Sequence, residues 1–347
     1  MRVPGFRASA VAAGIKYQNR PDLGIICCDK PAVTAAVFTR NLVKAAPVLD
    51  AMKLLENNSA FRAVVVNSGN ANACTGSRGL EDCLVIRKEA ARLLGCSPGQ
   101  ILVSSTGVIG AFLPMERFLS GLENAAEGLS EDGLPGVASA ILTTDTRPKT
   151  ATSRFSVDGY QIVLSGMAKG AGMIAPSMGL PQATMLSFVC CNAAVDPGFW
   201  QSALQEAVEH SFNRITVDGD MSTNDTVIAM ASGVAGNPVE DGSGQLAEGL
   251  KKALSNLLMD LSRQIVKDGE GATKCVTVLV RGARDEADAE LAARAISNSS
   301  LVKTAFFGQD PNWGRILAAA GRSGALFDPD RADIFIDQCQ IVRQGAP

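Results

Sequence analysis

The sequence predicts a mixed α/β protein, because strand-like runs alternate with amphipathic helical segments along the whole chain. The expected strands are rich in Val, Ile, Leu and Thr, residues that favour β-structure; they are 63–67, 101–106, 161–168, 184–191, 226–232 and 274–281. The expected helices are 81–94, 198–212, 245–267 and 286–297. Mixed elements of this kind argue for an α/β or α+β protein built in layers.

Local signals support three of these helices. Gly95 follows the first of them, and glycine commonly ends a helix. Asp196 and Pro197 precede the second, as an N-cap residue and a first-turn proline do. Within 245–267, leucines recur with the period of a helix.

Composition limits the classes of protein that the chain can belong to. The 347 residues suffice for one large or two medium domains, and 46% hydrophobic residues with 5% aromatics predict an aliphatic core. The net charge of -3 is small, and acidic and basic residues are mixed along the chain, which disfavours nucleic acid or an anionic membrane as partner. We expect a cytoplasmic protein, because the sequence shows neither a signal peptide nor the roughly 20 consecutive apolar residues of a membrane span.

Cysteine and histidine counts bear on the chemistry. The nine Cys include no C-x-x-C pair, which disfavours a zinc site and is typical of reduced, buried thiols; for Cys74 too we expect a structural role. His210 is the single His and falls near the end of an expected helix, where a structural or surface role is usual. Hydrolases of the Ser-His-Asp or Cys-His type need a positioned imidazole, so they are disfavoured.

Three glycine-rich polar segments could bring backbone N–H groups close to a ligand. They are 66–76, 104–110 and 165–176. Small residues at strand ends can form an oxyanion hole or an anion nest, although each segment alone is more typical of a turn. None is a phosphate loop, because G-x-x-x-x-G-K-[ST] is absent. Thr184, in the strand that follows the third segment, is by itself a typical β-branched strand residue.

Acidic segments leave further alternatives open. Residues 213–226 are crowded with short polar side chains that can satisfy their own backbone. Asp218, Asp220 and Asp225 could instead bind Ca or Mg, although no EF-hand pattern is present. Glu270, in a glycine-flanked bend, could meet a cationic amine or lie in a solvated turn.

Together these segments resemble the ornithine acetyltransferase family, the bifunctional glutamate N-acetyltransferases and amino-acid acetyltransferases of arginine biosynthesis. The stretches that carry the resemblance stand in family order across nearly the whole chain: VNSGNANACTG, SSTGVIG, TTDTRPK, GMAKGAGMIAP, ATMLSF, FNRITVDGDMSTNDT, KDGEGATK and FGQDPNWGRI. The resemblance implies two α/β lobes with helix-flanked sheets and a self-cleaving architecture with an N-terminal Thr nucleophile.

The resemblance also implies where the chain is cut. Family members cleave themselves before the Thr of A-T-M-L, here between Ala183 and Thr184, which would give an α chain of residues 1–183 and a β chain of residues 184–347. A free α-amine has a pKa near ~8 and can act as base for the neighbouring hydroxyl. This pairing would let a chain with a single His carry out acyl transfer.

The roles of the other matched residues follow from the same resemblance. Thr106 and Gly107 match the oxyanion-stabilising positions, and Thr143, Lys169 and Glu270 match substrate contacts, as does Thr184, the acetyl carrier. The acetyl group would pass from N-acetylornithine to Thr184 and, after ornithine departs, to glutamate. The resemblance implies an α2β2 assembly of cleaved chains and no cofactor; whether acetyl-CoA is also a donor stays open.

The sequence departs from the family pattern in three places. Ala175 stands where His is usual, and residues 179–182 intervene before Ala183. Cys190, Cys191, Asn192 and Ala193 replace a common T-T-D-A. Family members also continue beyond the position of Pro347 into a strand-rich stretch that contacts substrate, so we expect weak binding of ornithine and glutamate by this chain.

Two other functions remain open at this point. An N-terminal-nucleophile amidase or aminopeptidase would transfer the acyl group to water. A non-catalytic paralogue or a fragment would bind without turnover.

Overall fold

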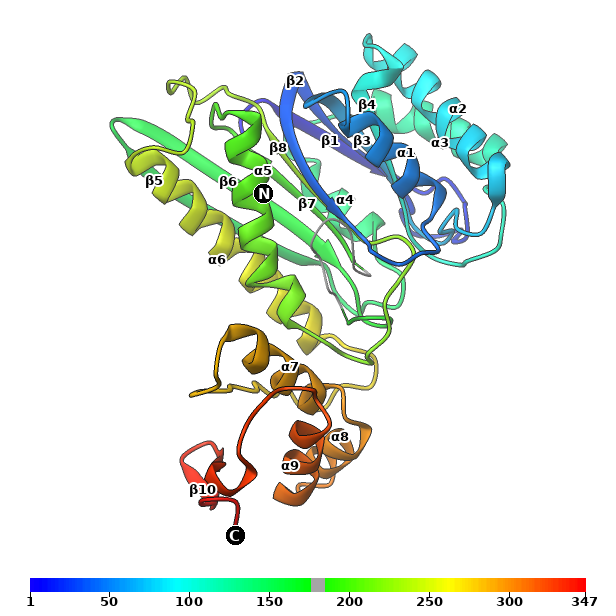
Figure 1. Ribbon diagram of the computed structural model, residues 1–347. Coiled ribbons are helices and arrows are strands. Elements are labelled where there is room, and N and C mark those ends of the chain that lie inside the picture. The colour runs from blue at the N-terminus through cyan, green and yellow to red at the C-terminus, as the bar shows by residue number, and fades with distance from the viewer. Residues whose placement is uncertain (176–184) are drawn as a thin grey trace. The chain divides into compact units, whose positions relative to one another are not determined.

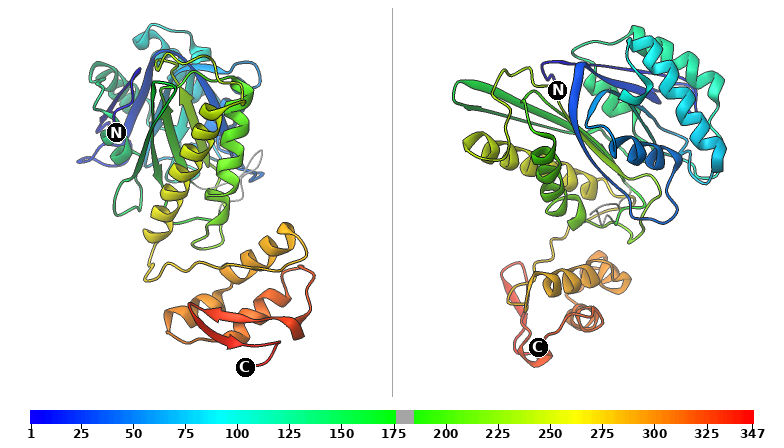
Figure 2. Two further views of the ribbon diagram at one scale, coloured as in Figure 1. Left: turned by 90° about the vertical axis from the view of Figure 1, so that its left-hand side faces the viewer. Right: turned by 45° about the horizontal axis from the view of Figure 1, so that its top comes forward.

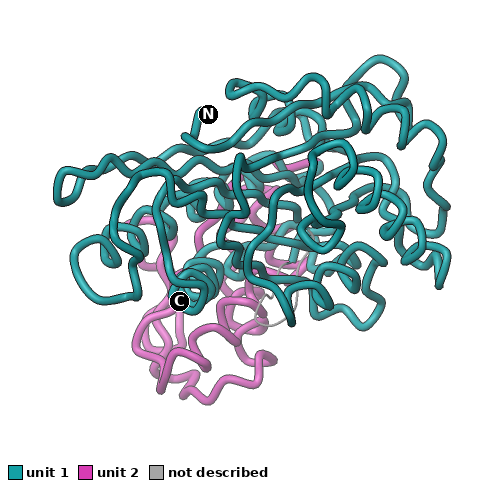
Figure 3. Tube along the Cα trace, turned by 90° about the horizontal axis from the view of Figure 1, so that it is seen from above, with its two compact units in different colours: residues 1–270 teal, residues 271–347 magenta. Residues whose placement is uncertain are grey.

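The computed structural model describes residues 1–175 and 185–347, and the chain forms two compact units (Figure 3). The first unit is Met1–Glu270 and the second is Gly271–Pro347. The boundary between the units, at residues 270 and 271, differs from the expected cleavage position between residues 183 and 184.

The first unit contains eight strands and six helices among its described residues (Figure 1). The strands are β1 (Phe6–Val11), β2 (Leu23–Phe38), β3 (Ala60–Asn67), β4 (Ile101–Ser105), β5 (Lys149–Val157), β6 (Tyr160–Lys169), β7 (Leu186–Cys191) and β8 (Thr226–Ala231). The helices are α1 (Ala46–Leu55), α2 (Gly76–Leu94), α3 (Met115–Glu127), α4 (Leu134–Ala140), α5 (Pro197–Glu209) and α6 (Gln245–Lys267).

All eight strands belong to one sheet, in the order β4-β3-β2-β8-β7-β6-β5, with β1 paired to β2. The pairs β3–β4 and β7–β8 are parallel, and the other pairs are antiparallel. The register places Lys169 of β6 opposite Leu186 of β7, and Leu186 opposite Thr226 of β8. The end of β6 and the starts of β7 and β8 therefore lie side by side at one end of the sheet.

Helices cover the sheet because strands and helices contribute to common apolar clusters. Helices α5 and α6 pack against each other on the sheet (Figure 2), with α5 against β2 and α6 against β5 and β6. Trp200 and Leu254 are fully buried in a cluster with strand residues such as Leu164. A second cluster joins α2 and α3 to β2, β3 and β4. A third cluster takes the alternate side chains of β2 and β3, including Ile26 and Val64, as the two faces of a strand require.

The second unit consists of three helices and a small two-stranded sheet. The helices are α7 (Glu286–Ser297), α8 (Ser300–Phe307) and α9 (Trp313–Gly321), and β9 (Ile334–Ile336) pairs with β10 (Cys339–Val342). Its core is small, with Ile296, Val302 and Ala319 buried together. The described residues of both units also include three 3-10 turns: η1 (Pro98–Gln100), η2 (Phe212–Arg214) and η3 (Pro329–Arg331).

The α/β class and most expected elements are confirmed. Helices α6 and α7 have the expected bounds, Gly95 ends α2 in the left-handed conformation with φ 65°, and the Asp196 side chain accepts hydrogen bonds from Gly198 and Phe199 at the start of α5. The strand expected at 274–281 is wrong. This segment pairs with no other part of the described chain, and β-structure requires a hydrogen-bonded neighbour.

Candidate active site

Thr106 directly follows β4, and a ladder of asparagine side chains holds it there. Asn67, at the end of neighbouring β3, accepts from the Ser105 hydroxyl at 2.7 Å and from the Thr106 N–H through its backbone carbonyl at 3.0 Å. Asn224 donates to the carbonyl oxygens of Ala71 and Ser105 at 2.6 and 2.8 Å, so it ties the end of β4 to the start of β8. Asn224 thus supplies hydrogen bonds that carbonyl groups of this irregular backbone would otherwise lack.

Gly107 occupies a position that only glycine fits. Its φ is 137°, and a Cβ atom there would lie 2.2 Å from the carbonyl carbon of Gly69. Two backbone segments therefore pass in direct contact beside Thr106. Thr106 is buried and Gly107 is exposed, so these residues stand at the boundary between the interior and solvent.

Lys169, the last residue of β6, brings a buried ammonium group to Thr106. Its Nζ donates to Thr106 Oγ1 at 3.4 Å, and the residue is 4% exposed. A small cavity beside Thr106 is lined by Thr106, Met185, Leu186, Ser222, Asn224 and Asp225. Met185 is the first described residue after Thr184, so the described chain resumes at this cavity.

Thr143 and Glu270 approach the same region through backbone contacts. Asp145 accepts from the N–H of Thr143 at 3.1 Å with one oxygen and from the N–H of Gly170, the neighbour of Lys169, at 2.6 Å with the other. The N–H of Glu270 donates to the Ala171 carbonyl at 2.8 Å. The structure therefore brings Thr106, Thr143, Lys169 and Glu270 together, whereas Ala183 and Thr184 lie outside the described residues.

Burial and charge perturb the acids and the base of this region. Burial lowers the pKa of Lys169 below its ordinary value, and the nearby Lys149 adds to this, while Asp145, Asp225 and Glu270 oppose it. Burial would raise the pKa of Asp145, but Lys169 and Lys149 hold it below the usual range. Such perturbations concentrate at functional sites.

Asp225 carries the opposite perturbation. Burial raises its pKa well above the ordinary value, although Lys169 and the N–H groups of Ser222 and Met185 favour the charged form. The residue is 1% exposed, and neither carboxyl oxygen has a hydrogen bond of normal geometry to the described residues. A carboxyl group in this state can hold a proton at neutral pH.

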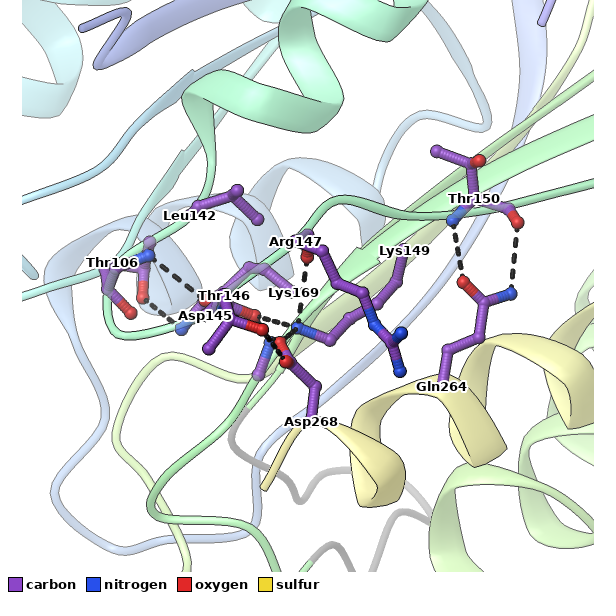
Figure 4. A network of polar contacts seen from close by, with 12 residues as sticks. Thr106, Leu142, Asp145, Thr146, Arg147, Lys149, Thr150, Lys169, Gln264 and Asp268 are labelled. Carbon is purple, nitrogen blue, oxygen red and sulfur yellow. Dashed lines mark hydrogen bonds and ion pairs between the residues drawn. The ribbon is translucent and has the colours of Figure 1, made fainter. Parts of the chain in front are cut away.

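Figure 4 shows a buried ionic network formed by Asp145, Lys149 and Asp268. Lys149, at the start of β5, forms ion pairs with Asp145 and with Asp268, which follows α6. These three residues stand in the motifs TTDTRPK and KDGEGATK, from which no role was predicted for them. The signal was present as an Asp and a Lys four residues apart in TTDTRPK, but burial could not be read from it.

The alternative of a metal site gains no support. Among residues 1–175 and 185–347 no group of three His, Cys, Asp or Glu side chains is arranged to hold a metal ion. Asp218 accepts from the N–H groups of Met173, Ile174 and Asp220. Its carboxylate thus holds the chain that follows Lys169, as the turn-network interpretation expects.

The departures from the family pattern have structural explanations where they are described. Burial raises the pKa of Cys191 to about 12 and raises that of Cys190 further, so both thiols stay protonated in the core. The Asn192 side chain bonds the backbone of Val163 and Gln161, which prolongs the contact between β7 and β6. Ala175 is buried, and residues 179–182 lie outside the described part of the chain.

His210 and Cys74 stand apart from these contacts. His210 is exposed at the C-terminal end of α5, and Cys74 is exposed in the loop before α2. No helix formed by the described residues is both long and apolar enough to cross a membrane.

Comparison with known proteins identifies the family. The ArgJ family matches residues 7–347. The arginine biosynthesis bifunctional protein ArgJ of Geobacter sulfurreducens is 53% identical over 345 residues, which are 99% of this chain and 86% of that protein. The protein of the same name from Desulfotalea psychrophila is 50% identical over 345 residues, again 99% of this chain and 86% of the relative.

Two of the solved structures that are similar to this chain cover about half of it. The arginine biosynthesis bifunctional protein of Bacillus halodurans is 40% identical and covers 51% of this chain and 92% of its own, with a TM-score of 0.48. An ornithine acetyltransferase from Mycobacterium tuberculosis, solved with ornithine, is 37% identical and covers 51% of this chain and 94% of its own, with a TM-score of 0.45. On the match of residues 7–347 and the identity to its full-length relatives, the chain belongs to the ArgJ family.

Proposed function

We propose that this protein cleaves itself before Thr184 and then transfers an acetyl group from N-acetylornithine to glutamate in arginine biosynthesis. Membership of the ArgJ family and the names of the relatives support the pathway and the bifunctional character. The observation that carries the proposal is the contact of Lys169 with Thr106 beside the cavity that Met185 lines. Because Met185 lines this cavity together with Thr106, a nucleophile on the residue before Met185 would be close to a hydroxyl that can stabilise an acyl oxygen.

The chemistry divides into two transfers through one ester. Cleavage frees the α-amine of Thr184, which takes the proton of its own hydroxyl as the oxygen attacks the acetyl carbonyl. The Thr106 hydroxyl and the Gly107 N–H stabilise the oxyanion. The C–N bond to ornithine breaks, and the departing amine receives the proton.

The second transfer reverses these roles. The α-amine of glutamate attacks the acetyl-Thr184 ester, the alkoxide of Thr184 leaves, and the proton returns to it. Lys169 is suited to a substrate carboxylate and Glu270 to a substrate amine, because each offers the opposite charge. In this scheme Thr143 is a further substrate contact, the reaction needs no cofactor, and acetyl-CoA would enter, if used, as an alternative acetyl donor.

Intact mass of the denatured protein tests the cleavage. We expect two fragments, residues 1–183 and 184–347, from the unmodified sequence. Thr184→Ala removes the nucleophile, so it should give one uncut chain without transferase activity. Thr152→Ala, at an exposed position on β5, is the matched control and should be cut and active.

Product analysis separates this reaction from hydrolysis. With N-acetylornithine and glutamate, the proposal requires acetylglutamate as the product, whereas an amidase would release acetate. Parallel double-reciprocal lines are expected for the two-step transfer. A Thr184→Ala variant with unchanged activity would exclude the covalent route, and elution as an α2β2 species on gel filtration would support the assembly that the family resemblance implies.

A further inference from the structure

We propose that Lys149 is a positioning residue, whose buried ammonium fixes the three segments that carry Thr143, Lys169 and Glu270. The inference rests on the proposed function, because those residues are its substrate contacts. Lys149 itself is fully buried, and within residues 1–175 and 185–347 its ammonium hydrogen-bonds to none of the residues assigned to the reaction. It acts through two carboxylates.

Lys149 makes use of every donor it has. Its Nζ donates to Asp145 Oδ1 at 2.5 Å, to Asp268 Oδ2 at 2.5 Å and to the Arg147 carbonyl at 3.4 Å. An ammonium group has three N–H donors and no acceptor. The group is therefore saturated by protein atoms, which suits a structural link and not a ligand contact.

The first carboxylate connects two predicted substrate contacts. Asp145 receives the N–H of Thr143 on one oxygen, and on the other it receives both Lys149 and the N–H that follows Lys169. A movement of Asp145 would thus displace both segments together. The Lys149 ion pair holds this carboxylate at its place in the interior.

The second carboxylate, that of Asp268, connects Lys149 to the segment of Glu270, the third predicted substrate contact. Asp268 stands two residues before Glu270 and accepts from the N–H and the hydroxyl of Thr146 as well as from Lys149. The adjoining end of α6 is fixed to β5 by Gln264, which exchanges two hydrogen bonds with the Thr150 backbone (Figure 4). Glu270 therefore leaves a helix end that is anchored at two points.

Stability alone does not account for such a network. The side chains of Lys149, Asp145 and Asp268 are 0%, 0% and 4% exposed, so little of the three charged groups is in contact with water. Apolar residues of similar volume often serve a core as well as a buried ion pair does. What the charges add is a defined geometry, since each bond joins a different segment.

A double-mutant cycle in kcat/KM tests the inference on the whole cleaved enzyme. Lys149→Met should lower kcat/KM for N-acetylornithine about 10²-fold, since small misplacements of positioning groups have effects of that size. In a Lys169→Met background the same change should cost clearly less, because one contact that it positions is already lost. Equal costs in both backgrounds would reduce Lys149 to a purely structural residue and overturn the inference.

A milder cycle keeps the test decisive if Lys149→Met does not fold. Asp268→Asn leaves the Lys149–Asp145 pair in place and loosens only the segment of Glu270. It should raise KM more than it lowers kcat, and the effect should shrink in a Glu270→Gln background; additive effects count against the inference. Lys149→Arg, which keeps the charge, should recover part of the activity that Lys149→Met loses.

Two controls separate this inference from the proposed function. Lys252→Met, at an exposed position on α6, should leave cleavage and kinetics unchanged. An unsubstituted enzyme that transfers no acetyl group would overturn the proposed function, and this inference with it. An active enzyme with additive cycles would overturn the inference alone.

Discussion

Two buried lysines on neighbouring strands show different uses of the same side chain. Lys149 begins β5 and Lys169 ends the adjoining β6, and the register sets Lys149 opposite Ala168. Lys149 is saturated by two carboxylates and a carbonyl oxygen. Within the described part of the chain, the Lys169 ammonium has one side-chain hydrogen bond, a long one to Thr106.

The difference separates a lysine that links segments of the fold from a lysine that can bind a ligand. A saturated ammonium has no donor left for a ligand, whereas Lys169 retains donors that a substrate carboxylate can take. Both lysines are buried. Lys149 forms two ion pairs, whereas Lys169 has acidic neighbours but no ion pair within 4.0 Å among residues 1–175 and 185–347.

The same substitution at both lysines should have the largest and most unequal effect on stability. Lys149→Met leaves Asp145 and Asp268 buried without their cation, so we expect the free energy of unfolding to fall by about 3–5 kcal/mol. Lys169→Met removes a charge that burial disfavours, so the fall should be much smaller. Denaturant unfolding measures both, and equal losses would show that the two lysines serve the same purpose.

Thr106→Ala should affect turnover and spare the fold. An oxyanion donor typically contributes a factor of about 10²–10³ to kcat, so the variant should lose activity of that order. Thr106→Ser keeps the hydroxyl and is the matched control. A Thr106→Ala variant with unreduced kcat would remove Thr106 from the reaction and leave Lys169 without its partner at the site.

The smallest effect concerns pH, and its two readouts have opposite signs. Because burial lowers the pKa of Lys169 below 10.5, its charge and its grip on a carboxylate should be lost as pH rises through that lowered pKa. Over the same interval the unfolded chain binds more protons than the folded chain, so the stability of the enzyme should rise relative to Lys169→Met. KM for N-acetylornithine and thermal unfolding, measured from neutral to alkaline pH, test both; a KM that stays flat would indicate that Lys169 does not bind the substrate through its charge.

Sequence patterns predicted the elements that depend on local signals. Helix α6 is predicted by its leucine period and α2 by the glycine that ends it, because both signals act within a few residues. The long strand β2 was missed, since its pairing with β1, β3 and β8 joins distant parts of the chain. The segment 274–281 shows the converse, because an apolar β-branched composition produces no strand without a neighbour.

The candidate site divides in the same way. Thr106, Thr143, Lys169 and Glu270 came from motifs, which a resemblance can transfer residue by residue. Asp145, Lys149 and Asp268 became visible only through their burial and contacts, because a charged residue in a sequence is usually on the surface. The raised pKa of Asp225 likewise depends on its burial, which no spacing of acidic residues reveals.

The strand order has a consequence for the two pieces that the proposed cleavage would produce. If the chain is cut before Thr184, the later piece supplies β7 and β8, and these lie between β6 and β2 of the earlier piece. Each piece alone would leave unpaired the strand edges that the other piece covers, so the two pieces would share one sheet. An exchange of pieces between finished molecules would therefore have to break both the β6–β7 and the β2–β8 pairing.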